Sequence, residues 1–311
     1  MEIALNRPEA VLIAGPTASG KSALALELAA RLDGVIVNAD AMQVYRELRV
    51  ISARPSPADE ARVPHALYGI ASVQEPFSVG RWAQAVGEAL PAIRARGQVP
   101  VIVGGTGLYF AALLNGLSPI PEIHPTIRAE ARLKLAELGN ERFHALLSAR
   151  DPVMGRRLEV GDSQRLVRAW EVIEATGQSL DEWQKLKGTP ILSGMQARFV
   201  LKPNRDWLKM QIARRFERMM TEGALEEVRA LGVIDDALPA ARALGVPQLL
   251  AHLRGEMALD VAFERAVTET RQYAKRQMTW FRNQMQDWVV VEGGSPDALF
   301  ACVTDRINHA C

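Results

Sequence analysis

Cysteine is scarce in this sequence of 311 residues, and the two that occur, Cys302 and Cys311, lie near the C-terminus. Two cysteines without metal-ligand spacing exclude a disulfide framework and fit a reducing compartment. The five histidines are scattered, without pairs at the spacing that zinc sites use. The sequence therefore predicts no structural metal.

An excess of charge of either sign is also absent. The chain has 37 Lys and Arg against 36 Asp and Glu, so its formal net charge is +1. The net charge therefore does not indicate a polyanionic partner, although a local basic surface is compatible with it. With 48% hydrophobic and 23% charged residues, the composition is that of a globular protein with one large core or two domains.

Long hydrophobic runs are missing as well. The first apolar run, residues 11–14, is too short for a signal peptide or a membrane span, and Gly-Pro follows it directly. We find no internal repeat and no low-complexity tract. We therefore expect a cytoplasmic protein without a membrane partner, and, since nothing indicates a symmetric interface, a monomer.

Short β-branched runs alternate with helix-patterned segments in the first third of the chain. Strands are expected at residues 10–14, 35–37 and 100–103, and helices at residues 22–32 and 79–96. This alternation predicts an α/β fold, with a parallel, doubly wound sheet and helices on both of its faces. The three prolines of residues 55–64 favour a short polar loop.

The pattern changes near Leu117, where Ser-Pro-Ile-Pro-Glu-Ile-His-Pro interrupts it and about seventy residues follow with helix signals but no convincing strand. Residues 198–202 then restore a strand, residues 207–220 a helix, and residues 288–291 favour a last strand. We therefore expect a core in two parts, residues 1–117 and 196–311, and an inserted all-helical subdomain at residues 118–195.

A phosphate-binding loop is the most specific local motif. Its eight residues match G-x-x-x-x-G-K-[ST] between an expected strand and an expected helix, which is the context that supports the motif; they are Gly15, Pro16, Thr17, Ala18, Ser19, Gly20, Lys21 and Ser22. Backbone N–H groups of such a loop converge on phosphate oxygens at a helix N-terminus. Lys21 adds a point charge, and the Ser22 hydroxyl suits Mg²⁺.

The carboxylate that many nucleotide hydrolases place on a later strand is missing. The expected strand there ends in Gly104-Gly105-Thr106-Gly107, which offers backbone and a hydroxyl instead. Asp40 closes the second expected strand, and the C-terminal strand ends of an open α/β sheet line its ligand crevice. Asp40 is therefore the candidate base, although an Asp in this position is as often a turn or cap residue.

The motifs together resemble those of the tRNA dimethylallyltransferases, from about Val11 to Val290. The matching segments occur in this order: GPTASGKS, NADAMQVYR, VIVGGTGLYF, DSQRLVRAWEV and AKRQMTWFR. The resemblance implies transfer of a dimethylallyl group from its diphosphate to N6 of the adenosine 3′ to the anticodon. It implies that the loop holds this diphosphate with Mg²⁺, that Asp40 is the general base, and that Lys21 and Thr106 take part in catalysis.

The resemblance also implies a set of tRNA contacts. These residues are Asp40, Ala41, Met42, Gln43, Thr106, Arg128, Gln164, Arg165, Leu166, Val167, Arg168, Arg242, Gly245, Lys275, Arg276, Gln277 and Arg282. The helix expected from Ser163, with an apolar stripe of Leu166, Trp170 and Ile173 and a C-cap at Gly177, is read from periodicity alone. An ordinary solvated helix face would explain its basic residues equally well.

The chain departs from the family pattern in three places. Ala41 stands where Ser is common, residues 49–55 read RVISARP where DIGTAKP is usual, and residues 243–247 read ALGVP where a Gly-Tyr-Arg run is common. The chain also lacks the Cys/His pair of the zinc finger of some eukaryotic relatives, so the bacterial type is the nearer match.

Two other functions remain open on the residues alone. A small-molecule or nucleoside kinase would use ATP on the same loop and Asp40 to activate a hydroxyl. That hypothesis gives no role to the KRQMTWFR segment or to the helical insertion. A tRNA- or nucleotide-binding module without activity is the third hypothesis, and measurable turnover would exclude it.

Overall fold

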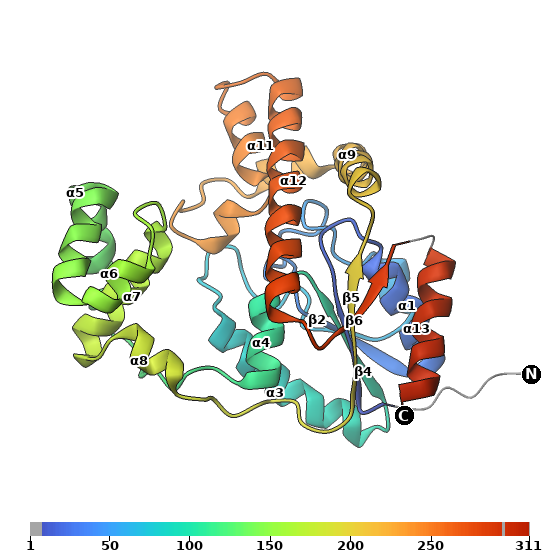
Figure 1. Cartoon of the computed structure of the whole chain (residues 1–311). Coiled ribbons are helices and arrows are strands. Elements are labelled where there is room, and N and C mark those ends of the chain that lie inside the picture. Colours follow the sequence, from blue (N-terminus) through green and yellow to red (C-terminus); the bar gives the residue numbers. More distant parts are fainter. Residues whose placement is uncertain (1–7, 294–295, 311) are drawn as a thin grey trace, which may run out of the picture. The chain divides into compact units, whose positions relative to one another are not determined.

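A computed structural model describes residues 8–293 and 296–310. Its described strands form one six-stranded sheet in the order β3-β2-β4-β1-β5-β6, and every neighbouring pair is parallel (Figure 1). The strands are β1 (Ala10–Ala14), β2 (Gly34–Asn38), β3 (His65–Ala66), β4 (Val99–Gly104), β5 (Gln196–Lys202) and β6 (Val289–Glu292). The predicted α/β fold with a parallel sheet is confirmed.

Helices cover both faces of the sheet, which is why β1, β2 and β4 are buried along their whole length. On one face, α1 (Lys21–Leu32) and α13 (Pro296–Ala310) lie side by side and pack Leu28 and Val303 into a core with Phe199 of β5 (Figure 1). On the other face lie α3 (Val79–Ala95) and α4 (Gly107–Asn115), joined by the stacked rings of Trp82 and Tyr109.

The strands expected at residues 35–37, 100–103, 198–202 and 288–291 are present, as are the helices expected at residues 79–96 and 207–220. The loop expected at residues 55–64 is wrong, because α2 (Pro57–Arg62) occupies most of it. Ser56 and Asp59 form a reciprocal capping box, and Pro57 stands in the first turn, where a proline costs no hydrogen bond. Helix α13 follows β6 without having been expected.

The chain divides into two compact units. The first comprises the chain up to Leu113 and from Leu192 onward, and the second comprises Leu114–Ile191. The second unit is helical and has its own hydrophobic core, in which Phe143 contacts Trp170. Its helices are α5 (Pro125–Arg150, interrupted at Gly139), α6 (Pro152–Arg157), α7 (Ser163–Thr176) and α8 (Leu180–Lys185).

The first unit continues after β5 with a helical segment before the last strand. Its elements are α9 (Arg205–Thr221), α10 (Ala224–Ala230), the 3₁₀ helix η1 (Pro239–Arg242), α11 (Val246–Leu253) and α12 (Leu259–Gln284). Within the described ranges, no helix combines the length and the apolar character that a membrane crossing requires. Cys302 is an exposed free cysteine on α13, and Cys311 lies outside the described residues.

Candidate active site

The phosphate loop runs from the C-terminal end of β1 into the first turn of α1. Ala18 and Gly20 adopt positive φ values of 62° and 85°, which turns the chain sharply before the helix begins. The Lys21 ammonium donates a hydrogen bond to the Pro16 carbonyl at 3.2 Å and so folds back over the loop. The motif therefore has the local shape that its sequence predicts, with the amides of the first helical turn directed out of the loop.

Two hydroxyls of the loop are suited to a ligand. The Ser19 side chain is buried, and its hydroxyl has no hydrogen-bond partner among the described residues. A buried polar group without a partner is costly unless a ligand or water completes it. Ser22, in contrast, is exposed at the first turn of α1. The loop thus offers one buried and one open oxygen beside its backbone amides.

Burial lowers the pKa of the Lys21 ammonium to about 8, with Asp40 opposing this effect and Arg215 adding to it. Lys21 therefore lies within electrostatic reach of one carboxylate and of a second cation. Burial likewise lowers the pKa of Arg215, which Asp40 opposes. A buried and a half-buried like charge that disfavour each other would be stabilised by an anion between them.

A pocket of about 260 Å³ opens at this point in the first unit. Its lining includes Ser19 and Lys21 of the loop, and Trp207, Arg215 and Arg218 of α9. Positions 207, 211, 215 and 218 follow helical spacing and so share one face of α9. Neither arginine is predicted from the sequence motifs, although this spacing, on a helix that follows a strand beside β1, is a usable signal.

Asp40 is held in a tight turn at the C-terminal end of β2. The buried Asn38 accepts a hydrogen bond from the Asp40 amide at 2.8 Å and donates to the Asp40 and Leu67 carbonyls. Asp40 Oδ1 in turn accepts from the Met42 amide at 2.9 Å. The carboxylate is therefore fixed through one oxygen and half-buried. Asn38 was not predicted from the sequence as a site residue.

Thr106 connects the ends of β2 and β4. Its hydroxyl accepts a hydrogen bond from the Ala41 amide at 2.9 Å, and its own amide donates to the Ala39 carbonyl at 3.2 Å. Thr106 therefore fixes the turn that carries Asp40. The Ala41 amide takes part through its backbone, so the missing serine hydroxyl is not needed for this contact.

Gln43 holds the segment that departs from the family pattern at residues 49–55. Its carboxamide donates to the Ser52 and Ala53 carbonyls at 3.0 and 2.8 Å. Arg215 donates to the same Ser52 carbonyl at 3.3 Å. On the other side, the Glu227 carboxylate accepts the amides of residues 49–51. This segment is therefore anchored next to the pocket by residues from three parts of the chain.

The charge of Asp40 affects the pKa of three of the four tyrosines of the chain. Burial raises the pKa of Tyr68, Tyr109 and Tyr273, and the negative charge of Asp40 raises each further. All three are therefore neutral phenols at physiological pH. They place aromatic surface near the carboxylate, which sequence analysis did not predict because the three are far apart in the chain.

Helix α12 carries residues of two kinds. Lys275, Arg276 and Arg282 are exposed, as expected of contacts with a phosphate backbone. Gln277 is buried instead, and its carboxamide accepts from the Thr17 amide at 3.0 Å and donates to the Gly105 carbonyl at 2.9 Å. Its side chain is therefore directed into the phosphate loop.

Two further expected contacts of the first unit differ in exposure. Arg242 is exposed at the end of η1. Gly245 is buried at the N-cap of α11 with a φ of 90°, and an added Cβ would lie 2.8 Å from the Phe216 ring and 2.9 Å from Ile51. The structure thus gives Gly245 a packing role, and no side chain could be added there without displacing its neighbours.

The expected contacts of the second unit separate in the same way. Arg128 on α5 and Gln164 and Arg165 on α7 are exposed, and Arg168 is partly so. Arg165 pairs with Asp162 at 3.2 Å, and Arg168 pairs with Glu171 at 3.3 Å. Leu166 and Val167 lie in the core of the unit. The helix that begins at Ser163 and its C-cap at Gly177 are as predicted.

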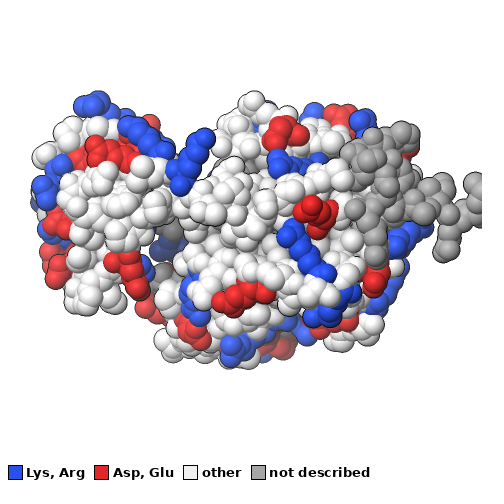
Figure 2. Space-filling view, turned by 90° about the horizontal axis from the view of Figure 1, so that it is seen from below, with Lys and Arg blue, Asp and Glu red and all other residues white. Residues whose placement is uncertain are grey.

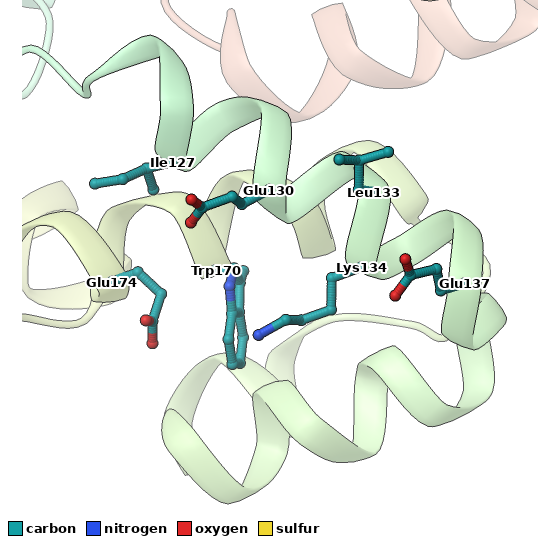
Figure 3. Close-up of a pocket in the computed structure, with 7 residues that line it drawn as sticks. All are labelled: Ile127, Glu130, Leu133, Lys134, Glu137, Trp170 and Glu174. Carbon is teal, nitrogen blue, oxygen red and sulfur yellow. The ribbon is translucent and has the colours of Figure 1, made fainter.

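The second unit also has a pocket of about 360 Å³ between α5 and α7. Figure 3 shows Lys134 beside Trp170, and the ammonium lies 4.7 Å from the ring centroid. Three glutamates, Glu130, Glu137 and Glu174, surround them. Three carboxylates against one ammonium disfavour a phosphate backbone, so the basic residues of α7, and not this pocket, are the candidates for nucleic-acid contact.

On the face that Figure 2 presents, Lys and Arg are interspersed with Asp and Glu. This distribution agrees with the balanced net charge of +1. A polyanion would therefore be held by local groups of basic residues and not by a broad field.

Comparisons with known proteins place this site in a family. The sequence profile of the "IPP transferase" family matches residues 43–284, and that of "Isopentenyl transferase" matches residues 8–64. The tRNA dimethylallyltransferase of Dinoroseobacter shibae is 54% identical over 94% of this chain and 97% of that protein. The one from Parvibaculum lavamentivorans is 52% identical over 90% of this chain and 89% of that protein.

A solved structure has the same fold. The tRNA delta(2)-isopentenylpyrophosphate transferase of Staphylococcus epidermidis superposes with a TM-score of 0.69 and 28% identity, covering 98% of this chain and 100% of that chain. The profile match spans well over half of the 311 residues, and the two relatives exceed half identity over nine-tenths or more of the chain. The chain therefore belongs to the IPP transferase family.

Proposed function

We propose that this protein transfers a dimethylallyl group from dimethylallyl diphosphate to N6 of the adenosine 3′-adjacent to the anticodon in tRNA, forming N6-isopentenyladenosine. One observation carries the assignment: Lys21 of the phosphate loop and Asp40 at the end of β2 interact electrostatically, while β4, which lies between their strands, ends in Gly-Gly-Thr without a carboxylate. A diphosphate and a base are thus accommodated together. The names of the relatives support the same reaction and give no support to a kinase.

The donor's diphosphate would occupy the pocket of the phosphate loop. The loop amides, Lys21 and the arginines Arg215 and Arg218 of α9 all carry positive charge or partial charge at this pocket. As the bond between the allylic carbon and the diphosphate oxygen breaks, negative charge grows on the leaving group. Fixed positive groups stabilise that charge where it develops, which lowers the barrier.

Mg²⁺ suits the Ser22 hydroxyl at the first turn of α1. Among the described residues, no three His, Cys, Asp or Glu side chains gather into a metal site. Mg²⁺ often binds through one or two protein oxygens together with substrate phosphates, so Ser22 and the diphosphate form a suitable set of ligands. When bound there, the ion would neutralise part of the charge on the leaving diphosphate.

Asp40 would accept the proton from N6 as the new bond forms between N6 and the allylic carbon. The adenine amine is a weak nucleophile because its lone pair is delocalised, so removing the proton during attack assists the reaction. The adenosine must leave its stack to reach such a base, at a cost of a few kcal/mol. The neutral and partly exposed Tyr68 and Tyr273, whose pKa values the charge of Asp40 raises, offer aromatic surface to replace that stacking.

The exposed basic residues would bind the tRNA. In the first unit these are Arg242, Lys275, Arg276 and Arg282, and in the second unit Arg128, Arg165 and the partly exposed Arg168, with the neutral, exposed Gln164 beside them. We propose that the helical insertion, residues 118–195, acts as a tRNA-contacting domain, and that the half-buried Ala41, Met42 and Gln43 line the place of the target base. Leu166, Val167 and Gly245 would support these surfaces from within.

The test is product analysis. The purified protein is incubated with Mg²⁺, dimethylallyl diphosphate and unmodified tRNA that carries adenosines beside the anticodon. The nucleosides of the tRNA are then analysed by mass spectrometry. We expect a gain of one isoprenyl unit on a single adenosine, with no gain when ATP replaces the diphosphate. Consumption of ATP with a small acceptor and no modified nucleoside would support the kinase instead.

A further inference from the structure

The side chain of Gln277 spans the two halves of the candidate site. It is 6% exposed, and both ends of its carboxamide are used: Oε1 accepts from the Thr17 amide at 3.0 Å, and Nε2 donates to the Gly105 carbonyl at 2.9 Å. Thr17 belongs to the phosphate loop, and Gly105 follows β4. A single residue of α12 therefore links the phosphate loop to the segment that follows β4.

Gly105 precedes Thr106, whose hydroxyl and amide fix the turn that carries Asp40. The chain of contacts consequently runs from the phosphate loop through Gln277 to Gly105 and Thr106, and from there to Ala41 and Asp40. A backbone hydrogen bond from the Gly15 amide to the Gly104 carbonyl at 3.3 Å also joins the loop to the end of β4. Both peptide groups that Gln277 binds lie beyond this bond.

The backbone is shaped around this contact. A Cβ on Gly105 would collide with Gln277 Nε2, so a glycine is required for the carboxamide to reach the carbonyl. Two residues further on, Gly107 is covered by the Trp280 ring of the same helix in the same way. Helix α12 is therefore seated directly on the segment after β4, and Gln277 is its one polar contact to both the loop and this segment among the described residues.

We propose that Gln277 is a positioning residue for the donor and not a tRNA contact. It holds the Thr17 amide of the phosphate loop at a fixed distance from the Thr106–Asp40 edge, so that the diphosphate and the base are in register. The inference rests on the proposed function, in which this loop holds the donor. It leaves the tRNA contacts of α12 to the exposed Lys275, Arg276 and Arg282.

The experiment compares Gln277→Leu and Gln277→Glu with the wild type. Leu removes both hydrogen bonds, whereas Glu keeps the acceptor for Thr17 but sets an oxygen against the Gly105 carbonyl. Gln272→Leu is the matched control, because it makes the same change at an exposed position of the same helix. Transfer is measured against donor concentration at saturating tRNA, tRNA affinity is measured without donor, and thermal unfolding checks the fold.

Leaving two buried peptide groups unpaired costs enough to predict a fall of roughly 10- to 100-fold in kcat/KM for the donor in Gln277→Leu. The tRNA dissociation constant should stay within about twofold of wild type, and Gln272→Leu should behave as wild type. Gln277→Glu, which is nearly isosteric, should show the same loss and so covers the case in which Gln277→Leu does not fold.

A second test uses a double-mutant cycle. Gly105→Ala should weaken donor use in the wild-type background, because the new methyl group displaces Gln277. In the Gln277→Ala background the same change should cost several-fold less, since the carboxamide is no longer there to be displaced. Equal costs in both backgrounds would contradict the linkage.

Two further outcomes distinguish failure of the role proposed for Gln277 from failure of the proposed transfer reaction. If the Gln277 variants weaken tRNA binding and leave the donor constants unchanged, Gln277 is a tRNA contact. If the wild type shows no transfer at all, the proposed function fails. In that case, calorimetric titration with inorganic pyrophosphate and Mg²⁺ still tests whether Gln277 positions the phosphate loop. Weaker binding in Gln277→Leu than in the wild type would support this role, and equal binding would overturn it.

Discussion

Lys21 begins α1 after β1, Asp40 follows β2, and the charge of Asp40 reaches the Lys21 ammonium although β4 lies between the two strands. The carboxylate raises the pKa of the buried ammonium, which burial alone would lower further than the value of about 8. A diphosphate adds negative charge to the loop, so Lys21 remains protonated in the complex. Asp40 is fixed through Oδ1 by the Met42 amide, and in the proposed reaction its other oxygen would accept the proton of the adenine amine.

Asp40→Asn should lower the rate of the chemical step by roughly 10²- to 10⁴-fold, which is the usual contribution of a general base. The amide oxygen still accepts from Met42, so the turn and the tRNA affinity should be unchanged. Single-turnover transfer and tRNA binding measure the two effects. Asp236→Asn, at an exposed position, is the control; a wild-type single-turnover rate in Asp40→Asn would remove Asp40 from the chemistry.

The use of the donor should depend on pH through Lys21. The protonated amine binds the diphosphate, and its pKa in the free protein is about 8. The KM for the donor should therefore rise as the pH increases from about 7 to about 9, because a growing fraction of the amine is neutral. In Lys21→Met the KM should be high and flat across this range. A flat profile in the wild type would contradict the role of the amine.

The sequence specified some site residues and not others for a physical reason. Lys21, Ser22 and Asp40 stand in local motifs whose geometry is set within a few residues. Arg215 and Arg218 reach the pocket through the packing of α9, and the tyrosines gather around Asp40 from distant segments. Such contacts depend on tertiary structure, which a motif does not encode.

At the scale of elements, the turns between helices and strands decide how the site is built. Pro57 at the start of α2 and the capping box of Ser56 and Asp59 are helix signals. The three prolines of residues 55–64 nevertheless favour a loop when only the sequence is considered. Strand β3 is too short for any periodicity to reveal, since it pairs only two residues with β2. Longer elements with clear periodicity, such as α3 and β5, were predicted close to their observed bounds.

Gly245→Ala should destabilise the first unit at the start of α11. The position combines a φ of 90° with close contacts to Phe216 and Ile51, so strain and overpacking add to about 1–3 kcal/mol. Urea unfolding measures the loss. Gly232→Ala is the control, because it has a φ of 62° but nothing within 4 Å of its added Cβ. A loss no larger than in this control would refute the packing role.

Helix α12 should bind tRNA through its exposed face. Lys275→Ala removes one phosphate contact, so the slope of log K against log salt should fall in magnitude by about 0.7 to 0.9. Single-turnover chemistry at saturating tRNA should change little. Lys209→Ala on α9, where the ammonium pairs with Asp206, should keep the wild-type slope. If Lys275→Ala also keeps that slope, Lys275 does not contact phosphate.

For the whole molecule, the parallel sheet and the helical insertion follow from patterns visible in the sequence. Alternating strands and helices predict the sheet, and a long interval of helix signals without strands predicts the insertion. The proposed tRNA contacts are harder to predict from the sequence. Which residues of a motif are exposed and which are buried depends on how its helix packs against the rest of the protein. Leu166 and Gln277 are such cases, since both lie within basic motifs and both are buried.

Positive and negative charges nearly balance over the whole molecule. With a net charge of +1, the proposed binding of tRNA would depend on a few basic residues in each unit. The donor pocket, in contrast, concentrates Lys21, Arg215 and Arg218 in one place. This concentration suits a small, highly charged ligand such as a diphosphate.

The proposed reaction requires the phosphate loop to hold an isoprenoid diphosphate and not a nucleotide. Equilibrium titration of the protein with dimethylallyl diphosphate and with ATP, each with Mg²⁺, tests it most directly when repeated on Lys21→Met. We expect tight binding of the isoprenoid diphosphate, much weaker binding of ATP, and loss of the former in Lys21→Met. Tighter binding of ATP, equally lost in Lys21→Met, would assign the loop to a nucleotide and refute the proposed donor.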